Sequence, residues 1–543
     1  MRKLLLLVAV TALLCSCRPS PAPTASVDRP GNPAAAADPF AYAEAGIGEL
    51  QAAMARGDTS SARLTDAYLA RIQALDQDPA GPRLNAFLEL NPDARTEAAA
   101  RDAERRAGRL RGPLHGIPVV LKDNIDATPM ATSAGSLALA GFRPGTDAFL
   151  VARLREAGAV ILGKNNLSEW ANFRSSRSIS GWSSRGGQTR NPYALDRSPC
   201  GSSAGTAVAV SANLAVAGIG TETDGSILCP AAMNGVVGFK PTVGLVSRSG
   251  ILPISHSQDT AGPMTRSVSD AALLLAAIVG RDPADPATAD NSTLLAPDYA
   301  ARLHVDALRG ARIGLLRQTM AISPEVAAAT EQAVAALREA GATVVDATLP
   351  TAGLWEQDER EVLLFEFKAG LERYLQQHGA PLTTLPALID YNRAHADQVM
   401  PLFGQELFEE AATRAGLGDP AYIAARMRAR RLAGSEGIDA ALRAQRLDAL
   451  VAPTTGVAWR IEPGHADRFP GAGYGAAAVA GYPALTVPMG HGNGLPLGLT
   501  FMGPAWSDAR LLQFGYAYEQ LTRARRPPLL PASAATVTGG GSH

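Results

Sequence analysis

Apolar positions along the chain fall into two patterns, a stripe spaced for helices and short continuous runs typical of buried strands. The first stripe follows Thr59-Ser60, a pair that can cap a helix, and it predicts one helix with a single apolar face: Leu64, Tyr68, Ile72 and Leu75. The apolar run at 117–121 predicts a buried strand that ends at Lys122.

The two patterns alternate through most of the sequence. The further predicted helices are 97–109, 150–157, 205–214, 324–341, much of 354–446, and 508–521. The further predicted strands are 159–162, 215–219, 311–316, 343–345, 447–451, 485–488 and 497–501. This alternation predicts an α/β protein with a parallel or mixed sheet, and we expect one large domain over residues 39–530.

The N-terminus has the pattern of an export signal. Arg2 and Lys3 precede an apolar run at 4–14 that is too short to span a bilayer. We therefore expect a signal peptide over residues 1–17 and an exported protein, periplasmic or secreted. The sequence Leu14-Cys15-Ser16-Cys17 resembles a lipobox, so Cys17 is a candidate lipid anchor.

Beyond the signal we expect a Pro/Ala-rich linker at 18–38 and a disordered tail at 531–543. Two of the four cysteines lie in the leader, and we expect the other two, Cys200 and Cys229, to be free, buried thiols. The formal net charge of −1 argues against a nucleic-acid partner, which requires a basic surface.

Two loops of small residues carry the candidate chemistry. Segments 199–205 and 220–227 flank a predicted helix and strand, which can bring both loops to one edge of the sheet. Ser226 lies in a tight turn before a predicted helix start at Pro230. Backbone N–H groups in such a turn can hold an oxyanion, although a serine there is more often only a cap or turn residue. The groups concerned are those of Thr223, Asp224, Gly225 and Ser226.

Two other residues have ambiguous patterns. Gly201–Gly205 fits the Gly-x-Ser-x-Gly nucleophile elbow with Ser203 at its centre, but that elbow must follow a strand and 191–199 has the composition of a loop. Lys122 ends a strand, where a lysine is usually solvated. It can act as a base only if burial or positive neighbours lower its pKa.

Several motifs together resemble the amidase signature family, in the order found there. The family resemblance covers almost all of residues 40–530 and rests on these segments: Gly116–Asn124, Gly163–Glu169, Gly201–Ser203, Thr221–Ile227, Gly238–Thr242 and Gly481–Leu485. Runs at 168–173, 186–193 and 451–459 resemble the bacterial peptide amidases within that family. Some positions differ from the broad family pattern, namely Asn165, Cys200, Ala204, Asp224 and Leu228.

This resemblance implies a single α/β/α domain around a central mixed sheet. It also implies a Ser-Ser-Lys triad in which Lys122 and Ser202 relay protons for the nucleophile Ser226, through an acyl-enzyme. The expected reaction is removal of the C-terminal amide of peptides with release of ammonia. The expected partner is thus a peptide amide, with no cofactor, and we expect a monomer. We expect no metal, because His115, His256 and His304 lie in no ligand-spaced cluster.

Three alternatives remain open. One is another hydrolase of the same family, such as a general amidase or a glutamine amidase of the amidotransferase type. The second is a His-dependent α/β-hydrolase esterase built on Ser203. The third is an exported solute-binding protein without turnover.

Overall fold

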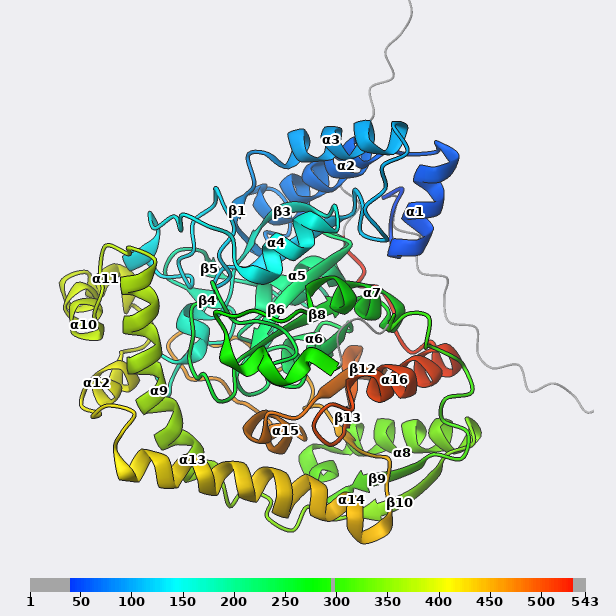
Figure 1. Cartoon of the computed structure of the whole chain (residues 1–543), viewed down its shortest axis with the longest axis vertical. Coiled ribbons are helices and arrows are strands. Elements are labelled where there is room, and N and C mark those ends of the chain that lie inside the picture. The colour runs from blue at the N-terminus through cyan, green and yellow to red at the C-terminus, as the bar shows by residue number, and fades with distance from the viewer. Residues whose placement is uncertain (1–39, 294–297, 531–543) are drawn as a thin grey trace, which may run out of the picture. The chain divides into compact units, whose positions relative to one another are not determined.

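Eleven strands form one central sheet in the computed structural model, which describes residues 40–293 and 298–530 (Figure 1). The predicted signal peptide, the linker, the anchor at Cys17 and the C-terminal tail lie outside the described residues. In the order in which they are paired, the strands are β1 (Phe87–Leu90), β3 (Val160–Asn165), β2 (Pro118–Lys122), β6 (Ala217–Glu222), β8 (Thr260–Thr265), β7 (Val237–Lys240), β12 (Ala484–Gly492), β13 (Leu495–Met502), β11 (Ala449–Pro453), β9 (Arg312–Leu316) and β10 (Thr343–Ala347). A separate pair contains β4 (Trp182–Ser183) and β5 (Gly187–Gln188).

The sheet is mixed, as the sequence predicts. Strand β2 pairs in parallel with β3 and β6, and β9 pairs in parallel with β10 and β11. The other pairs in the sheet are antiparallel. Every residue of β2, β3 and β6 is buried, which explains why the sequence shows continuous apolar runs there and no alternation.

Helices cover both faces of this sheet. The first half of the chain contains α1 (Ile47–Arg56), α2 (Ser61–Ile72), α3 (Ala94–Arg106), α4 (Phe149–Glu156), α5 (Ala204–Ser211), α6 (Leu228–Met233) and α7 (Val268–Ile278). The second half contains α8 (Pro324–Glu339), α9 (Glu356–Gln377), α10 (Leu385–Ala394), α11 (Ala396–Val399), α12 (Glu406–Ala412), α13 (Pro420–Ala433), α14 (Asp439–Gln445), α15 (Gly475–Ala480) and α16 (Asp508–Thr522).

Strand β12 shows the layering directly. Gly515 of α16 lies against Leu485 and Val487, whereas Gly498, beside Thr486, lies against Ala232 of α6. Since successive side chains of a strand point to opposite faces, α16 and α6 cover opposite sides of the sheet. The single α/β/α architecture expected from the family resemblance is confirmed.

Local sequence signals account for several element boundaries. The hydroxyl of Ser60 caps α2 by accepting a hydrogen bond from the Arg63 N–H at 3.3 Å. Strand β9, helix α8 and strand β10 form the predicted βαβ unit with parallel strands. The predicted helical region 354–446 contains α9 to α14. In Figure 1, α9 to α12 lie at the left, and α13 crosses the lower part of the view. No helix in the described part of the chain has both the length and the apolar character needed to cross a membrane.

A fully buried ion pair fixes the segment that follows β3. The guanidinium of Arg174 donates to the Glu169 carboxylate at 2.7 Å and to the Val399 carbonyl at 2.6 Å, and both charged side chains are fully buried. The same guanidinium lies 4.4 Å from the ring centre of Phe403. Arg174 therefore connects the segment after β3 to the end of α11 and to the residues that follow it.

Loss of one partner of this pair is expected to destabilise the fold. Arg174→Met leaves the Glu169 carboxylate buried without its cation, so the free energy of unfolding should fall by about 3–5 kcal/mol. Denaturant unfolding measures the change. Arg177→Met, an exposed substitution in the same loop, is the matched control and should change stability by less than about 0.5 kcal/mol. An Arg174→Met variant as stable as that control would contradict this interpretation.

Candidate active site

Lys122 is buried completely at the C-terminal end of β2, and its amine donates hydrogen bonds to the loop before α5 and to β6. The Nζ donates to Ser202 Oγ at 2.7 Å, to Thr221 Oγ1 at 2.8 Å and to the Thr221 carbonyl at 3.1 Å. Two of the residues expected to act together, Lys122 and Ser202, are thus in hydrogen-bond contact. Thr221, at the end of β6, positions the amine and was not singled out from the sequence.

Burial changes the acidity of this amine. Removal from water lowers the pKa of Lys122 to about 7, while the carboxylates of Asp259 and Glu222 act in the opposite direction. The neutral form is therefore populated near neutral pH, which an exposed lysine does not achieve. A lysine with these contacts can accept a proton from Ser202.

The two serine loops lie against each other as expected. The Ser203 N–H donates to the Ser226 carbonyl at 3.1 Å, so the loop before α5 contacts the loop before α6. Ser202 follows Gly201 through a cis peptide bond. Within the described part of the chain, no direct hydrogen bond joins the Ser202 and Ser226 side chains.

Ser203 has a structural role in this arrangement. Its hydroxyl is fully buried, donates to the Thr221 carbonyl at 3.0 Å and accepts from the Thr221 N–H at 3.2 Å. No strand precedes it directly, because 191–200 forms turns and irregular backbone. The nucleophile elbow that Ser203 would need is therefore missing from this part of the described chain.

Ser226 borders a cavity of about 770 Å³ and is only 8% exposed. The N–H groups of Thr223, Asp224 and Ser226 make no hydrogen bond to other described residues, and the Gly225 N–H lies beside the Glu222 carboxylate. Glu222 in turn accepts the N–H groups at the start of α6, including that of Ile227 at 2.7 Å. This loop can offer backbone donors to a developing negative charge.

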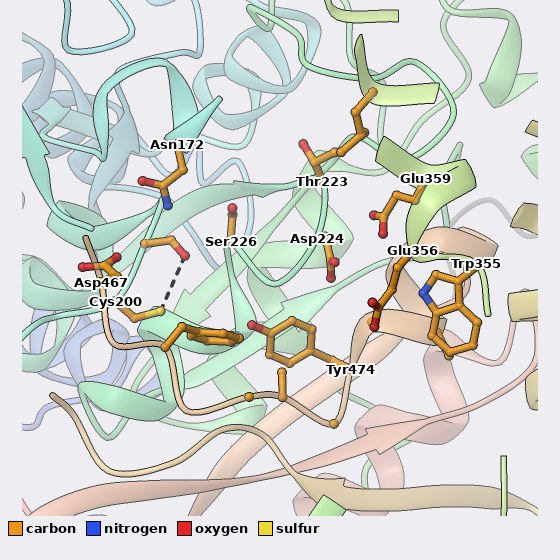
Figure 2. A pocket seen from close by; sticks show the side chains of 18 of the residues that line it. Asn172, Cys200, Thr223, Asp224, Ser226, Trp355, Glu356, Glu359, Asp467 and Tyr474 are labelled. Atoms are coloured by element: carbon orange, nitrogen blue, oxygen red, sulfur yellow. Dashed lines mark hydrogen bonds between the residues drawn. The ribbon is translucent and has the colours of Figure 1, made fainter. Parts of the chain in front are cut away.

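Position 225 requires glycine because of its backbone conformation and because a side chain would clash with a neighbour. Its φ of +78° lies in the left-handed region, and a Cβ on it would come within 2.2 Å of the Tyr474 ring. Figure 2 shows Tyr474 beside the Ser226 loop, with the Ser226 hydroxyl and the Asp224 carboxylate pointing in different directions. The Asp224 carboxylate therefore need not oppose an oxyanion beside Ser226.

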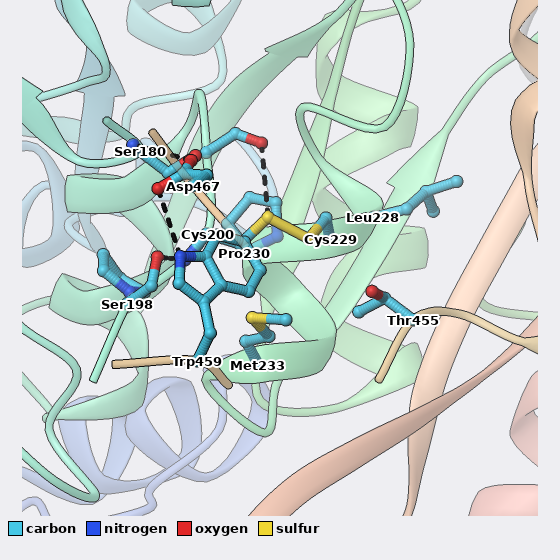
Figure 3. The surroundings of a disulfide bond; sticks show 12 residues. Ser180, Ser198, Cys200, Leu228, Cys229, Pro230, Met233, Thr455, Trp459 and Asp467 are labelled. Atoms are coloured by element: carbon cyan, nitrogen blue, oxygen red, sulfur yellow. Dashed lines mark hydrogen bonds between the residues drawn. A yellow bond between two sulfur atoms is a disulfide. The ribbon is translucent and has the colours of Figure 1, made fainter. Parts of the chain in front are cut away.

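The prediction of free thiols at Cys200 and Cys229 is wrong. The two cysteines form a disulfide with Cα atoms 5.9 Å apart (Figure 3). Cys200 lies two residues before Ser202, and Cys229 lies three residues after Ser226, in α6. The bond joins the loop of Ser202 to the helix that follows the loop of Ser226, which agrees with the predicted convergence of the two loops.

Several residues of the site were not identified from the sequence. Asp259 accepts a hydrogen bond from Thr223 Oγ1 at 2.5 Å, and burial raises the pKa of Asp259 to about 6. Glu356 and Glu359, at the start of α9, line the same cavity as Ser226. Asp467 accepts from the Ser180 N–H at 2.9 Å, which holds another part of the wall. No local pattern marks these residues, since each reaches the site from a distant segment.

Among residues 40–293 and 298–530, no group of three His, Cys, Asp or Glu side chains is arranged to hold a metal ion.

The chain is similar over most of its length to several known proteins. The peptide amidase from Stenotrophomonas maltophilia has 66% identity and a TM-score of 0.88, covering 90% of this chain and 99% of its own. A probable amidase from Arabidopsis thaliana is 39% identical over 501 residues, 90% of this chain and 92% of the relative. A glutamyl-tRNA(Gln) amidotransferase subunit from Chloroflexus aurantiacus is 38% identical, covering 88% of this chain and 97% of the relative.

The model of the family described as amidase matches residues 63–512, which include both serine loops and Lys122. With this match over most of its length, the chain belongs to the amidase family.

Proposed function

We propose that this protein hydrolyses the C-terminal carboxamide of peptides, using Ser226 as nucleophile and Ser202 with Lys122 as its proton relay. The observation that carries the mechanism is the buried Lys122 amine, whose pKa is lowered to about 7 and which is 2.7 Å from Ser202 Oγ. The substrate is inferred from the 66% identity to a peptide amidase over 90% of the chain.

The proposed reaction has two stages. Ser226 Oγ attacks the carboxamide carbon, its proton passes to Ser202 Oγ, and the proton of Ser202 passes to neutral Lys122. The oxyanion accepts hydrogen bonds from the backbone N–H groups of Thr223, Asp224, Gly225 and Ser226, with that of Gly225 also near Glu222. The relay then returns a proton to the amide nitrogen, the C–N bond breaks and ammonia leaves. Water cleaves the resulting ester by the same relay and restores Ser226.

We also propose that the protein is exported and acts as a monomer. The basic and apolar leader at 1–17 supports export, and Cys17 is the candidate anchor. The Cys200–Cys229 disulfide also supports export, because disulfides persist in oxidising compartments outside the cytoplasm.

The nucleophile is tested by covalent labelling. A fluorophosphonate should modify Ser226, and Ser226→Ala should lower kcat by about 10⁴- to 10⁶-fold while the unfolding transition is kept. Mass spectrometry of the labelled peptide locates the adduct. An adduct on Ser203 would favour the esterase alternative, and a protein with no serine adduct would favour a solute-binding protein.

The base is tested by the pH dependence of kcat/KM. A base must be deprotonated, so activity should rise with pH through about 7, the lowered pKa of Lys122. Because the Asp259 carboxylate raises that pKa, Asp259→Asn should move the rising limb to lower pH. Lys122→Ala and Lys122→Arg should each lower kcat by several orders of magnitude, since a guanidinium stays protonated.

Histidine substitutions are the control for this experiment. His256→Gln should leave the limb near pH 7 in place, because the proposed relay contains no histidine. An active Lys122→Ala variant, or a limb that Asp259→Asn moves to higher pH, would contradict the proposed base.

The substrate is tested by ammonia release. Dipeptide amides should have a kcat/KM at least about tenfold above those of free glutamine and simple aliphatic amides, as the peptide backbone supplies extra contacts in the cavity. Equal rates on glutamine would favour the glutamine amidase alternative, which the similarity to an amidotransferase keeps open. Simple amides as the best substrates would favour a general amidase.

A further inference from the structure

Three carboxylates from two distant segments line the cavity that Ser226 borders. Asp224 belongs to the Ser226 loop, and Glu356 and Glu359 belong to the first turn of α9. In Figure 2 the Asp224 carboxylate lies on the side of Glu356 and Glu359. Asp224 keeps an exposed surface, and desolvation is the main cause of its raised pKa. Repulsion from Glu359, Glu222 and Glu356 adds to this effect, while Lys240 opposes it.

These carboxylates form no ion pair within the described part of the chain. No salt bridge between described residues includes Asp224, Glu356 or Glu359. Asp358, in the same turn of α9, is instead paired with Arg428, whose Nε lies 2.6 Å from Asp358 Oδ2. The helix dipole favours acidic residues in this turn, but it does not require two of them to face the cavity.

Glu359 is held in position with one oxygen still open. The Gln258 side chain donates to Glu359 Oε1 at 2.9 Å and to the Thr223 carbonyl at 3.3 Å, so one amide connects Glu359 to the Ser226 loop. Glu359 is 8% exposed, and its Oε2 makes no hydrogen bond among the described residues. Burial raises the pKa of Glu359 to about 7, which is expected of a carboxyl group that lacks an ion-pair partner.

The same cavity has an apolar wall beside these carboxylates. Leu316, Leu349 and Trp355 line it, and each is less than 9% exposed. An aliphatic stem ending in a positive charge fits such a combination, because the stem packs on the apolar side chains while its charged end reaches the carboxylates.

We propose, resting on the function proposed above, that Asp224, Glu356 and Glu359 bind a cationic group of the peptide amide, an ammonium or a guanidinium, and so favour positively charged substrates. The group has two possible sources. One is the side chain of a lysine or arginine in the peptide, and the other is its free α-ammonium. Both offer N–H donors that a carboxylate binds more strongly than it binds a neutral donor.

Matched peptide amides distinguish the two sources. Acetyl-Ala-Lys-NH₂ and acetyl-Ala-norleucine-NH₂ share the aliphatic stem and differ in the side-chain charge. Unblocked Ala-norleucine-NH₂ and its acetylated form differ only in the α-ammonium. The quantity measured is the ratio of kcat/KM within each pair, which cancels a general loss of activity.

At least one ratio should favour the cation in the native enzyme. Glu359→Gln and Glu356→Gln should each lower that ratio by about ten- to a hundredfold, the effect of one hydrogen bond to a charged group. Asp358→Asn is the matched control, since Asp358 is in the same turn but paired with Arg428, and it should leave the ratio unchanged. Ratios near one in the native enzyme, or ratios that the glutamine variants do not alter, would overturn the proposal.

A binding measurement separates this proposal from the proposed reaction. In titration calorimetry, pentylammonium should bind the native protein more tightly than 1-pentanol does, and Glu359→Gln should remove the difference. If no peptide amide is hydrolysed but this difference is found, the proposed function fails and the cation subsite stands. If peptide amides are hydrolysed and pentylammonium binds no better than 1-pentanol, the subsite is overturned.

Discussion

The complete burial of the Lys122 amine is the constraint on which the rest of the site depends. A charged amine loses its hydration when it is buried. The protein must therefore either supply hydrogen-bond acceptors or favour the neutral, deprotonated amine. Here the acceptors are the hydroxyl groups of Ser202 and Thr221 and one backbone carbonyl. Hydroxyl groups can pass protons on without carrying a full charge, so the contacts that stabilise the amine are also the ones that the proposed relay uses.

The fold was predictable where burial alone determines the pattern. Two apolar patterns identified elements correctly: the continuous run before Lys122 identified β2, and the spaced positions from Leu64 to Leu75 identified α2. Both patterns follow directly from which side chains are buried. The βαβ unit around α8 followed for the same reason. Order and register in the sheet could not be read this way, since they depend on contacts between strands far apart in the sequence.

The candidate site was predictable only in part. Lys122, Ser202 and Ser226 were identified through motifs of a known family, and their roles stay predictions that the experiments above test. The disulfide could not be predicted from the number of cysteines, because only the convergence of the two loops places Cys200 beside Cys229. Glu356 and Glu359 could not be identified from the sequence because acidic residues at the start of a helix usually face solvent. Only the packing of α9 shows that Glu359 is buried and that both residues line the cavity.

The relay and the cavity wall belong to separate parts of the molecule. Lys122 and Thr221 lie on adjacent strands, so sheet hydrogen bonding fixes their separation, whereas Glu356 and Glu359 are carried by a helix outside the sheet. A mutation in that helix that spares the link from Glu359 through Gln258 to the Ser226 loop can change the wall, while the sheet keeps the contacts of the proposed relay. Such a division makes the protein evolvable, because drift in the outer helices explores new substrates at little risk to the chemistry.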